Sequence, residues 1–446
     1  MSSPDPRVHF LARQQAFAAS LGDEPAWRAQ PRAEAIAAFA DSGLPHSKLE
    51  EWRYTNVAPI AKVAWELAAP PAHQIDRADL ESHAFPVFAC SVFVFVNGRF
   101  APELSAGTRL PGGARVESLA TLRTAGGSPP AAFASLVDSK QHPFAALNTA
   151  FFDDGAVIRI PRGGDVGQPI HLVFVSAPTD VPSVIHPRVL VEAEPGSRAC
   201  LIQDFVSVGN AAGFTNSVTE LRVGENAALD FVLLQREPDH RFHVANLAVH
   251  QERASRFSGH TLTFGGALVR NDASVLLADE GAECSLDGLF VGGGSQLLDN
   301  HTLVDHAVPH CTSDERYKGI LGGSARGVFR GRVLVRPDAQ KTRANQSSRN
   351  LLLGARAEID TKPQLEIYAD DVKCSHGSTI GQLDPDALFF LRSRGIGESR
   401  ARDLLTRAFG LEILEALPSP ALGQALDELL LARLRQARLA SAEESR

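Results

Sequence analysis

The region from about residue 156 to residue 382 most limits the folds open to this chain, because this long run contains no convincing amphipathic helix. Short segments rich in Val, Leu, Ile and Phe alternate there with polar turns, which is typical of strands. Similar turns recur, as in EAEPGSRACL, RVGENAALDF, ADEGAECSLDG and LLGARAEIDT. This recurrence favours a β-solenoid, in which each coil buries its face against its neighbours, over a β-sandwich with a fixed number of strands. We therefore predict a mainly β protein with a β-solenoid core.

Helical patterns flank the β region on both sides. Good helix formers fill roughly the first 65 residues, in AEAIAAFADSGL and KLEEWRYTNVAPI. Residues 87–100 are rich in Val and Phe, and their Asn97-Gly98 pair predicts a hairpin. The helical period returns at Asp384-Pro385, an N-cap followed by a residue suited to the first helical position. We predict an N-terminal helical region with a short strand pair (1–130), the β-helix core (131–383) and a C-terminal helical domain (384–446).

Leucines follow one face of the last predicted helix, at positions Leu422, Leu426, Leu429, Leu430 and Leu434. Such a stripe either packs within a small helical unit or docks a partner. We favour packing within the unit and keep docking as the alternative.

Composition excludes several classes of protein. The chain has 446 residues, 44% of them hydrophobic, and a net charge of −8, so it lacks the basic surface of a nucleic-acid binder. No 18 apolar residues run together, and the first residues do not read as a secretory signal. Its five cysteines are scattered and odd in number, unlike a disulfide framework. We expect a cytoplasmic protein with reduced thiols, no nucleic-acid partner and no membrane.

The segment ADDVKCSHGST places Cys374 and His376 two residues apart in a predicted strand. Side chains alternate along a strand, so the two share one face, with their Cα atoms about 6.6 Å apart. A thiolate and an imidazole together suit iron–sulfur or zinc chemistry. Two ligands do not complete a site, and a subunit interface is one source of the others. The alternative is a buried Cys with a hydrogen-bonded His beside it.

A second group of potential ligands occurs in HTLVDHAVPHC, which contains His301, His306, His310 and Cys311. Their spacing does not match the usual zinc pairs, and His301 and His306 fall on opposite faces of a strand. We therefore expect no zinc site there. Cys200 and Cys284 follow turn motifs and are expected to be core residues.

Two alternative functions are compatible with a solenoid. One is a polysaccharide hydrolase or lyase, which needs paired carboxylates; Asp370 and Asp371 would project to opposite faces, and no other pair is evident. The other is a purely structural scaffold subunit in which Cys374 and His376 belong to the core. The glycine-rich segments 292–296 and 322–327 lack the Gly-Lys-Ser/Thr ending of a phosphate loop, so we expect no nucleotide bound by this chain.

Longer strings identify a family. YKGILGGSARGVFRGRVLVRPDAQKTRANQSSRNLLLG, followed by AEIDTKPQLEIYADDVKCSHGSTIGQLDPDALFFLRSRGI, resembles the SufB/SufD family of iron–sulfur cluster assembly proteins, and closely its SufD branch. The match is dense over about residues 315–397. KLEEWRYTN and VFVNGRF extend it in the same order toward the N-terminus.

The resemblance implies a right-handed parallel β-helix between helical ends and a heterodimer with a SufB-like paralogue. It also implies docking of a SufC-like ABC-type ATPase on the C-terminal helices, so that this chain is a non-catalytic scaffold subunit and the partner hydrolyses ATP. For that docking we expect contacts from Phe389, Leu391, Leu404, Leu405 and Phe409.

The resemblance also implies a role for the Cys-x-His pair. It places His376, and with it Cys374, at the SufB–SufD interface, as transient ligands of iron or of a nascent cluster that support iron entry and de novo cluster formation. The SufB branch has a Cys near the position of Ser348 and a Glu directly after the His. This chain has Ser348 and Gly377 instead, which implies that it is the auxiliary half of the scaffold.

Overall fold

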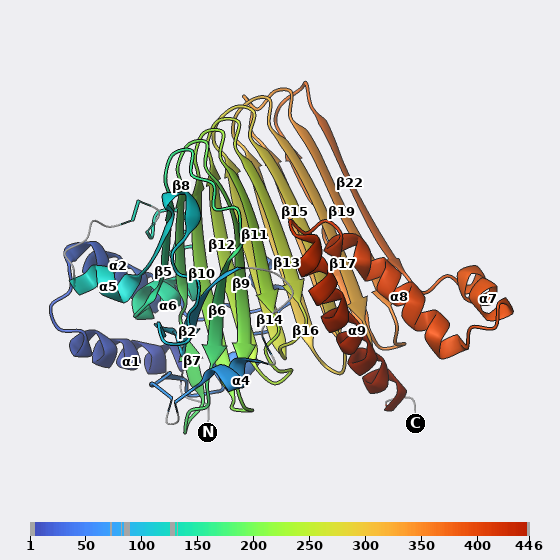
Figure 1. Ribbon diagram of the computed structural model, residues 1–446, viewed down its shortest axis with the longest axis horizontal. Helices are drawn as coiled ribbons and strands as arrows, with labels where there is room; N and C mark the ends of the chain where they lie inside the picture. The colour runs from blue at the N-terminus through green and yellow to red at the C-terminus, as the bar shows by residue number, and fades with distance from the viewer. Residues whose placement is uncertain are drawn as a thin grey trace.

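The computed structural model describes residues 5–71, 74–81, 83, 90–124, 130–131 and 133–443. Its centre is a pair of long, mostly parallel sheets, here called sheet A and sheet B (Figure 1). In the coils from β10 onward, successive strands alternate between the two sheets, and each residue pairs with one 26 to 32 positions further on, as in Phe242 with Leu268 and Arg326 with Glu358. The solenoid has about 8 turns. The predicted parallel β-helix is confirmed.

The strands of each sheet follow in stacking order. Sheet A contains β4 (Arg115–Ser118), β5 (Gly155–Ile160), β8 (Arg188–Ala193), β10 (Gly213–Val223), β12 (Phe242–Gln251), β14 (Leu268–Leu277), β16 (Leu297–His306), β18 (Arg326–Val335) and β20 (Glu358–Thr361), with β1 (Glu66–Leu67), β7 (Ser183–Ile185) and β21 (Gln364–Ile367) beside them. Sheet B contains β3 (Arg99–Phe100), β2 (Ser91–Val96), β6 (Ile170–Ser176), β9 (Arg198–Ser207), β11 (Ala228–Gln235), β13 (Arg256–Thr263), β15 (Glu283–Gly292), β17 (Thr312–Leu321), β19 (Arg343–Leu352) and β22 (Lys373–Gly381).

Side chains that point between the sheets form the main core. Because the strands are parallel and in register, like residues stack on like: Phe95 pairs with Phe174, and Phe174 with Phe205. Their ring centroids are 4.9 and 5.2 Å apart, and all three rings are buried. Stacked aromatic pairs add to the burial of their apolar area.

The glycine-rich segments form turns that lead from sheet B to sheet A, between β15 and β16 and between β17 and β18. Gly294 and Gly323 have φ values of 55° and 61°, a left-handed backbone that glycine adopts without a steric penalty. A Cβ on Gly323 would lie 2.9 Å from the backbone N of Gly294 in the turn below. Small residues are therefore needed where these turns stack.

The predicted hairpin is confirmed. β2 and β3 pair antiparallel around Asn97 and Gly98, whose φ values of 47° and 81° suit a two-residue turn. Residues 87–89 of the predicted strand segment lie outside the described residues.

The N-terminal region contains α1 (Pro6–Ser20), α2 (Ala26–Ser42), α3 (Ala58–Ala61), α4 (Arg77–Glu81), α5 (Leu119–Thr124) and α6 (Pro143–Phe151), with the 3-10 turns η1 (Glu50–Trp52) and η2 (Pro111–Gly113). Most of this layer lies on the outer side of sheet A, whereas α4 lies beside sheet B, where Leu80 packs against a cluster that includes Val175 of β6 and Val206 of β9. Trp65 shows how the two layers join, since its ring packs against Phe214 and Phe242 on sheet A.

The prediction of a helix over KLEEWRYTNVAPI is wrong, because only η1 and α3 form there. Side chains of this segment contact the sheet instead of continuing a helix. Trp52 lies against the guanidinium of Arg270, 3.7 Å from its ring centroid, and Glu51 pairs with Arg330 at 2.8 Å. The buried cation–π contact of Trp52 with Arg270, together with the partly exposed ion pair of Glu51, outweighs the modest helix propensity of the local sequence.

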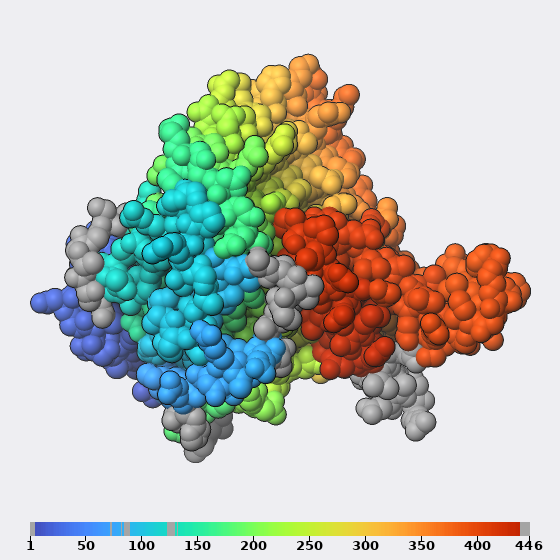
Figure 2. Space-filling model, in the orientation of Figure 1, coloured from blue at the N-terminus to red at the C-terminus, as the bar shows by residue number. Residues whose placement is uncertain are grey.

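The C-terminal helices are α7 (Pro385–Ser393), α8 (Glu398–Leu414) and α9 (Pro420–Glu443). Asp384 caps α7 as predicted, because its carboxylate accepts the backbone N–H of Asp386. α8 and α9 lie across the outer face of sheet B, whereas α7 extends away from the body (Figures 1 and 2).

The leucine stripe of α9 lies in the interface between the helices and the β-helix. Leu422, Leu426 and Leu430 are fully buried, in one apolar cluster that includes Leu414 of α8 and Ile320 of β17. The stripe thus packs within the helical unit, as predicted, and against the β-helix as well. In the part of the chain that the structure describes, no helix combines the length and apolar character needed to cross a bilayer.

Replacing Phe205 with Ala should lower the free energy of unfolding by about 3–5 kcal/mol, because it removes the end of the stacked aromatic row and leaves a cavity. Phe389→Ala, the same change at a side chain that is 73% exposed, is the matched control and should leave stability nearly unchanged. Urea unfolding followed by circular dichroism measures both. Equal losses would show that the stacked row does not support the fold.

Candidate functional site at the open end of the β-helix

Strand β22 is the last strand of sheet B, and this end position determines how exposed the candidate site is. Among the described residues it pairs with β19 on one side and with no strand on the other. All of its residues except the half-buried Cys374 are exposed, whereas inward-facing side chains of β19 are buried. The β-helix is therefore open at this end.

Cys374 and His376 lie on the same face of β22, and that face points into the solenoid. Their register partners in β19 are Ala344 and Gln346, both buried. Ser375 lies between them and points outward, where its hydroxyl donates to Asn345 at 2.8 Å.

The two side chains differ in their surroundings. Cys374 packs against a small apolar cluster that includes Val333 and Ala344, and this burial raises the pKa of its thiol. In the isolated chain this sulfur therefore carries its proton at neutral pH. His376 is exposed at the open end.

A row of polar side chains continues inward from His376. The register pairs His376 with Gln346 and Gln346 with Glu315, and the last two are fully buried. Gln346 Nε2 donates to Glu315 Oε1 at 3.1 Å, and Thr302 Oγ1 donates to Glu315 Oε2 at 2.5 Å. We call Glu315, Gln346 and His376 the polar column.

Glu315 is a fully buried acid inside the β-helix. Burial raises its pKa to about 7, although hydrogen bonds from Thr302 and Gln346 act in the opposite direction. Buried groups with displaced pKa values are found at functional sites more often than elsewhere. Gly331 on sheet A provides the space, since a Cβ there would lie 2.1 Å from Gln346 Nε2.

No group of three or more His, Cys, Asp or Glu side chains that could hold a metal occurs among the described residues. The potential ligands of the HTLVDHAVPHC segment point in different directions. His301 points outward and contacts Asp299 at 3.0 Å, whereas His306 points inward and is hydrogen-bonded to Ser313 at 2.8 Å. Burial lowers the pKa of His306 to about 4, so its imidazole is neutral at physiological pH.

The expectation of core residues is confirmed for Cys284 and wrong for Cys200, which alternates with the inward-facing Ala199 and Leu201 on β9. Cys284 is buried in the main cluster and Cys200 is half-buried. Burial raises the pKa of Cys200 to about 12 and that of Cys284 still further, which makes both thiols unreactive.

The residues expected to dock an ATPase differ in exposure. Phe389 and Leu404 are exposed, whereas Leu391, Leu405 and Phe409 are half-buried. Phe409 lies against the β-helix, with Lys318 Nζ 4.4 Å from its ring centroid. Sequence analysis missed Phe390, which is 53% exposed beside Phe389.

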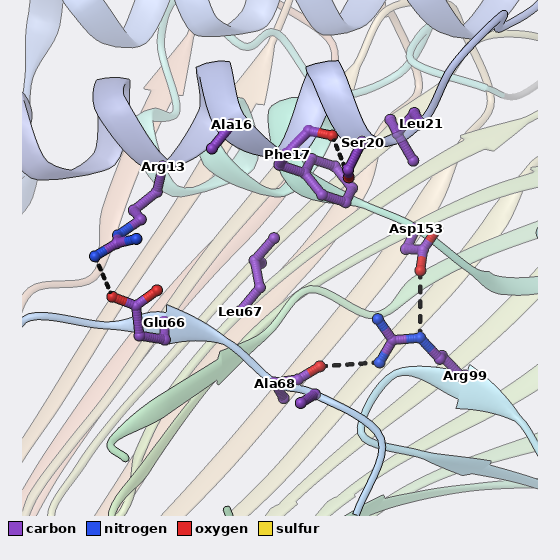
Figure 3. Close-up of a pocket in the computed structure, with 11 residues that line it drawn as sticks. Arg13, Ala16, Phe17, Ser20, Leu21, Glu66, Leu67, Ala68, Arg99 and Asp153 are labelled. Carbon is purple, nitrogen blue, oxygen red and sulfur yellow. Dashed lines mark hydrogen bonds and ion pairs between the residues drawn. The ribbon is translucent and has the colours of Figure 1, made fainter. Parts of the chain in front are cut away.

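A cavity of about 470 Å³ lies far from this end, between α1 and the segment around β1 (Figure 3). Its charged groups are already paired: Arg13 with Glu66 at 2.6 Å, and Arg99 with Asp153 at 3.4 Å. Arg99 also donates to the carbonyl of Ala68 at 2.9 Å. These contacts join the N-terminal helices to the solenoid, and we assign no ligand to the cavity.

Sequence analysis also missed Gln346 and Glu315. Alternation along TSDERYKGIL and RANQSSRNLL places both on the inward face, beside Tyr317 and Ser348. The alternation could have predicted that Gln346 and Glu315 point inward. Only the register between strands shows that they lie in one row with His376.

Comparison with known proteins identifies both matching family models and similar proteins that cover most of the chain. The family model described as "SUF system FeS cluster assembly, SufBD core domain" matches residues 174–409, and "SufBD protein N-terminal region" matches residues 23–172. The iron–sulfur cluster assembly protein SufD of Escherichia coli is 33% identical, over 86% of this chain and 88% of its own. A protein named as an iron–sulfur cluster assembly SufBD family member, from Synechocystis, is 34% identical over 85% of each chain. A chloroplastic protein of Arabidopsis thaliana is 36% identical over 62% of this chain and 60% of its own.

The raised pKa of Glu315 predicts a pH-dependent stability. The folded chain holds this proton up to about pH 7, whereas the ordinary value is 4.5, so the stability associated with it is lost as the pH rises between these values. From about pH 4 to about pH 8, the unfolding free energy of Glu315→Gln should gain about 3 kcal/mol relative to wild type. Urea unfolding at both pH values measures the difference. A constant difference would contradict the buried-acid interpretation.

Proposed function

The chain belongs to the SufB/SufD family of iron–sulfur cluster assembly proteins, and on that premise we propose that it is a SufD-like scaffold subunit. In this proposal it pairs with a SufB-like paralogue, docks a SufC-like ABC-type ATPase and supports iron entry and de novo cluster formation at the subunit interface. The observation that carries the proposal is the position of Cys374 and His376 on a strand with a free edge.

The free edge of β22 supports pairing with a paralogue. An exposed edge strand offers unpaired N–H and C=O groups to a strand from another chain. Exposed apolar side chains lie close by in sequence, with Tyr368 62% and Ile380 53% exposed. A second β-helix that adds its own end strand would bury them and would enclose His376 and Cys374 between two subunits.

The chemistry of this pair suits iron as cargo. A neutral imidazole nitrogen of His376 binds iron directly, whereas Cys374 must lose its proton first, and a coordinated metal favours that loss. Two side chains are too few for a closed site, so the partner subunit supplies the remaining ligands. The reaction is assembly on a scaffold, and this chain is not itself the enzyme.

The C-terminal helices support docking of the ATPase. α7 extends from the body (Figure 2). Its Phe389 and Phe390 side chains are 73% and 53% exposed. α8 is tied to the β-helix through Lys318, whose Nζ donates to the carbonyl of Phe409 at 2.9 Å and pairs with Glu412 at 2.5 Å. A partner that contacts α7 and α8 differently in its two nucleotide states would shift the population of β-helix arrangements.

A cytoplasmic location is part of the proposal, and the five unpaired cysteines agree with a reducing compartment. The family membership favours this role over the alternative of a polysaccharide-cleaving enzyme. The purely structural alternative is tested by substitution at His376.

His376→Ala should abolish cluster build-up in the complex co-expressed with SufB-like and SufC-like partners, because the imidazole ligand is lost. The complex should still co-purify. Ser375→Ala is the matched control on the outward face of the same strand and should assemble clusters normally. The absorbance of the anaerobically purified complex reports the cluster. Normal build-up by His376→Ala would reject the ligand role.

Phe389→Ala combined with Phe390→Ala should weaken retention of the ATPase at least ~10-fold, as expected for exposed aromatic anchors. Val8→Ala, at an apolar side chain that is 62% exposed in the N-terminal region, is the control. Binding of purified SufC-like partner is measured by calorimetry. Unchanged affinity of the double variant would place the docking surface elsewhere.

A further inference from the structure

We propose that Gln346, held in place by Glu315, is a positioning residue for His376: its carboxamide oxygen accepts a hydrogen bond from one imidazole N–H and so directs the other ring nitrogen toward iron at the interface. The inference rests on the proposed function, because it assumes that His376 binds iron. It adds two residues from inside the β-helix to the site at its open end.

The orientation of Gln346 follows from its partner. Its Nε2 donates to Glu315 Oε1 at 3.1 Å. Glu315 Oε1 accepts this hydrogen bond when the acid is ionised and also when it is neutral with its proton on Oε2, beside Thr302, so the amide nitrogen faces Glu315 and the amide oxygen faces away from it. That oxygen is buried and has no hydrogen-bond partner among the residues that the structure describes.

The next side chain along the row is His376. β19 and β22 are parallel neighbours in register, so the Cα atoms of Gln346 and His376 are about 4.8 Å apart and both side chains project to the same face. The imidazole of His376 therefore offers an N–H donor in the same row, next to the amide oxygen of Gln346. Covering the open end would favour this hydrogen bond, because it removes His376 from water.

The row changes character toward the open end. On the earlier coils it consists of Leu201, Phe231, Gly259 and Leu286, and it then becomes Glu315, Gln346 and His376. Apolar residues fill the row elsewhere, so the fold does not need polar groups there. A buried acid and an unpaired amide oxygen both cost stability. This cost is understandable if the column serves the site.

The role proposed for Gln346, to accept a hydrogen bond from a metal-binding histidine, is common in metal sites. Histidines that bind metal donate their other ring N–H to a carbonyl or carboxylate, which fixes the tautomer and the orientation of the ring. Here Gln346 provides the carbonyl, Glu315 fixes the amide, and Gly331 leaves room for it.

The test compares variants of Gln346 in the complex with its SufB-like and SufC-like partners. Gln346→Met keeps the length and removes the acceptor. Gln346→Glu is the conservative rescue, since a neutral carboxylic acid can donate to Glu315 and still accept from His376. Ser348→Ala is the matched control, because Ser348 is buried on the same strand and pairs with Ser378, outside the column.

The readout is the affinity of the metal-free complex for ferrous iron, measured anaerobically, together with cluster build-up. Gln346→Met should bind iron ~10-fold more weakly or worse, which is the usual loss on removing such a supporting group. Gln346→Glu and Ser348→Ala should bind like wild type. Equal affinity of Gln346→Met and wild type, or an equal loss in Gln346→Met and Gln346→Glu, would overturn the inference.

A second variant covers the case in which Gln346→Met does not fold. Glu315→Gln preserves shape and allows the amide of Gln346 to turn, so it should also weaken iron binding, and unchanged affinity would overturn the inference. His376→Ala separates the two proposals. If it leaves iron binding and cluster build-up intact, the proposed function fails; if it abolishes them while Gln346→Met does not, only the positioning role fails.

Discussion

The structure depends on the in-register stacking of parallel coils. Each side chain lies above the side chain at the equivalent position one coil earlier. Neighbouring side chains in a row are therefore in contact and must be compatible in size and polarity. The row from Phe95 through Phe174 to Phe205 is stabilised in this way, by aromatic contact and by burial. The same geometry brings together residues that are about a coil apart in sequence, which is how Glu315, Gln346 and His376 come to lie in one row.

Stacking also explains why the site lies at the end. A coil in the middle of a solenoid is covered on both sides, whereas the last coil has one uncovered edge. β19 buries its inward side chains, but β22 presents the corresponding positions to solvent. A second subunit could therefore reach β22 without any opening of the core, which is the basis of the proposed interface site, and the buried Gln346 and Glu315 lie in the row behind His376.

The local patterns in the sequence predicted much of this arrangement. Alternation placed Cys374 and His376 on one face, Asn97-Gly98 predicted the hairpin, and Asp384 marked the start of α7. The failure at KLEEWRYTN has a clear cause. Trp52 and Glu51 are committed to Arg270 and Arg330 of strands more than 200 residues away, and no local propensity carries that information.

The sequence alone determined the β-helix, its helical ends, the shared face of the Cys-x-His pair and the likeness to one family, because each depends on short-range periodicity or on continuous strings of residues. Only the tertiary structure decided that this pair sits on an uncovered edge, that a buried acid and an amide continue the row behind His376, and that α9 packs on both α8 and the solenoid. These features depend on the register between coils. That register results from packing contacts along the whole stack of coils, and no local sequence pattern specifies it.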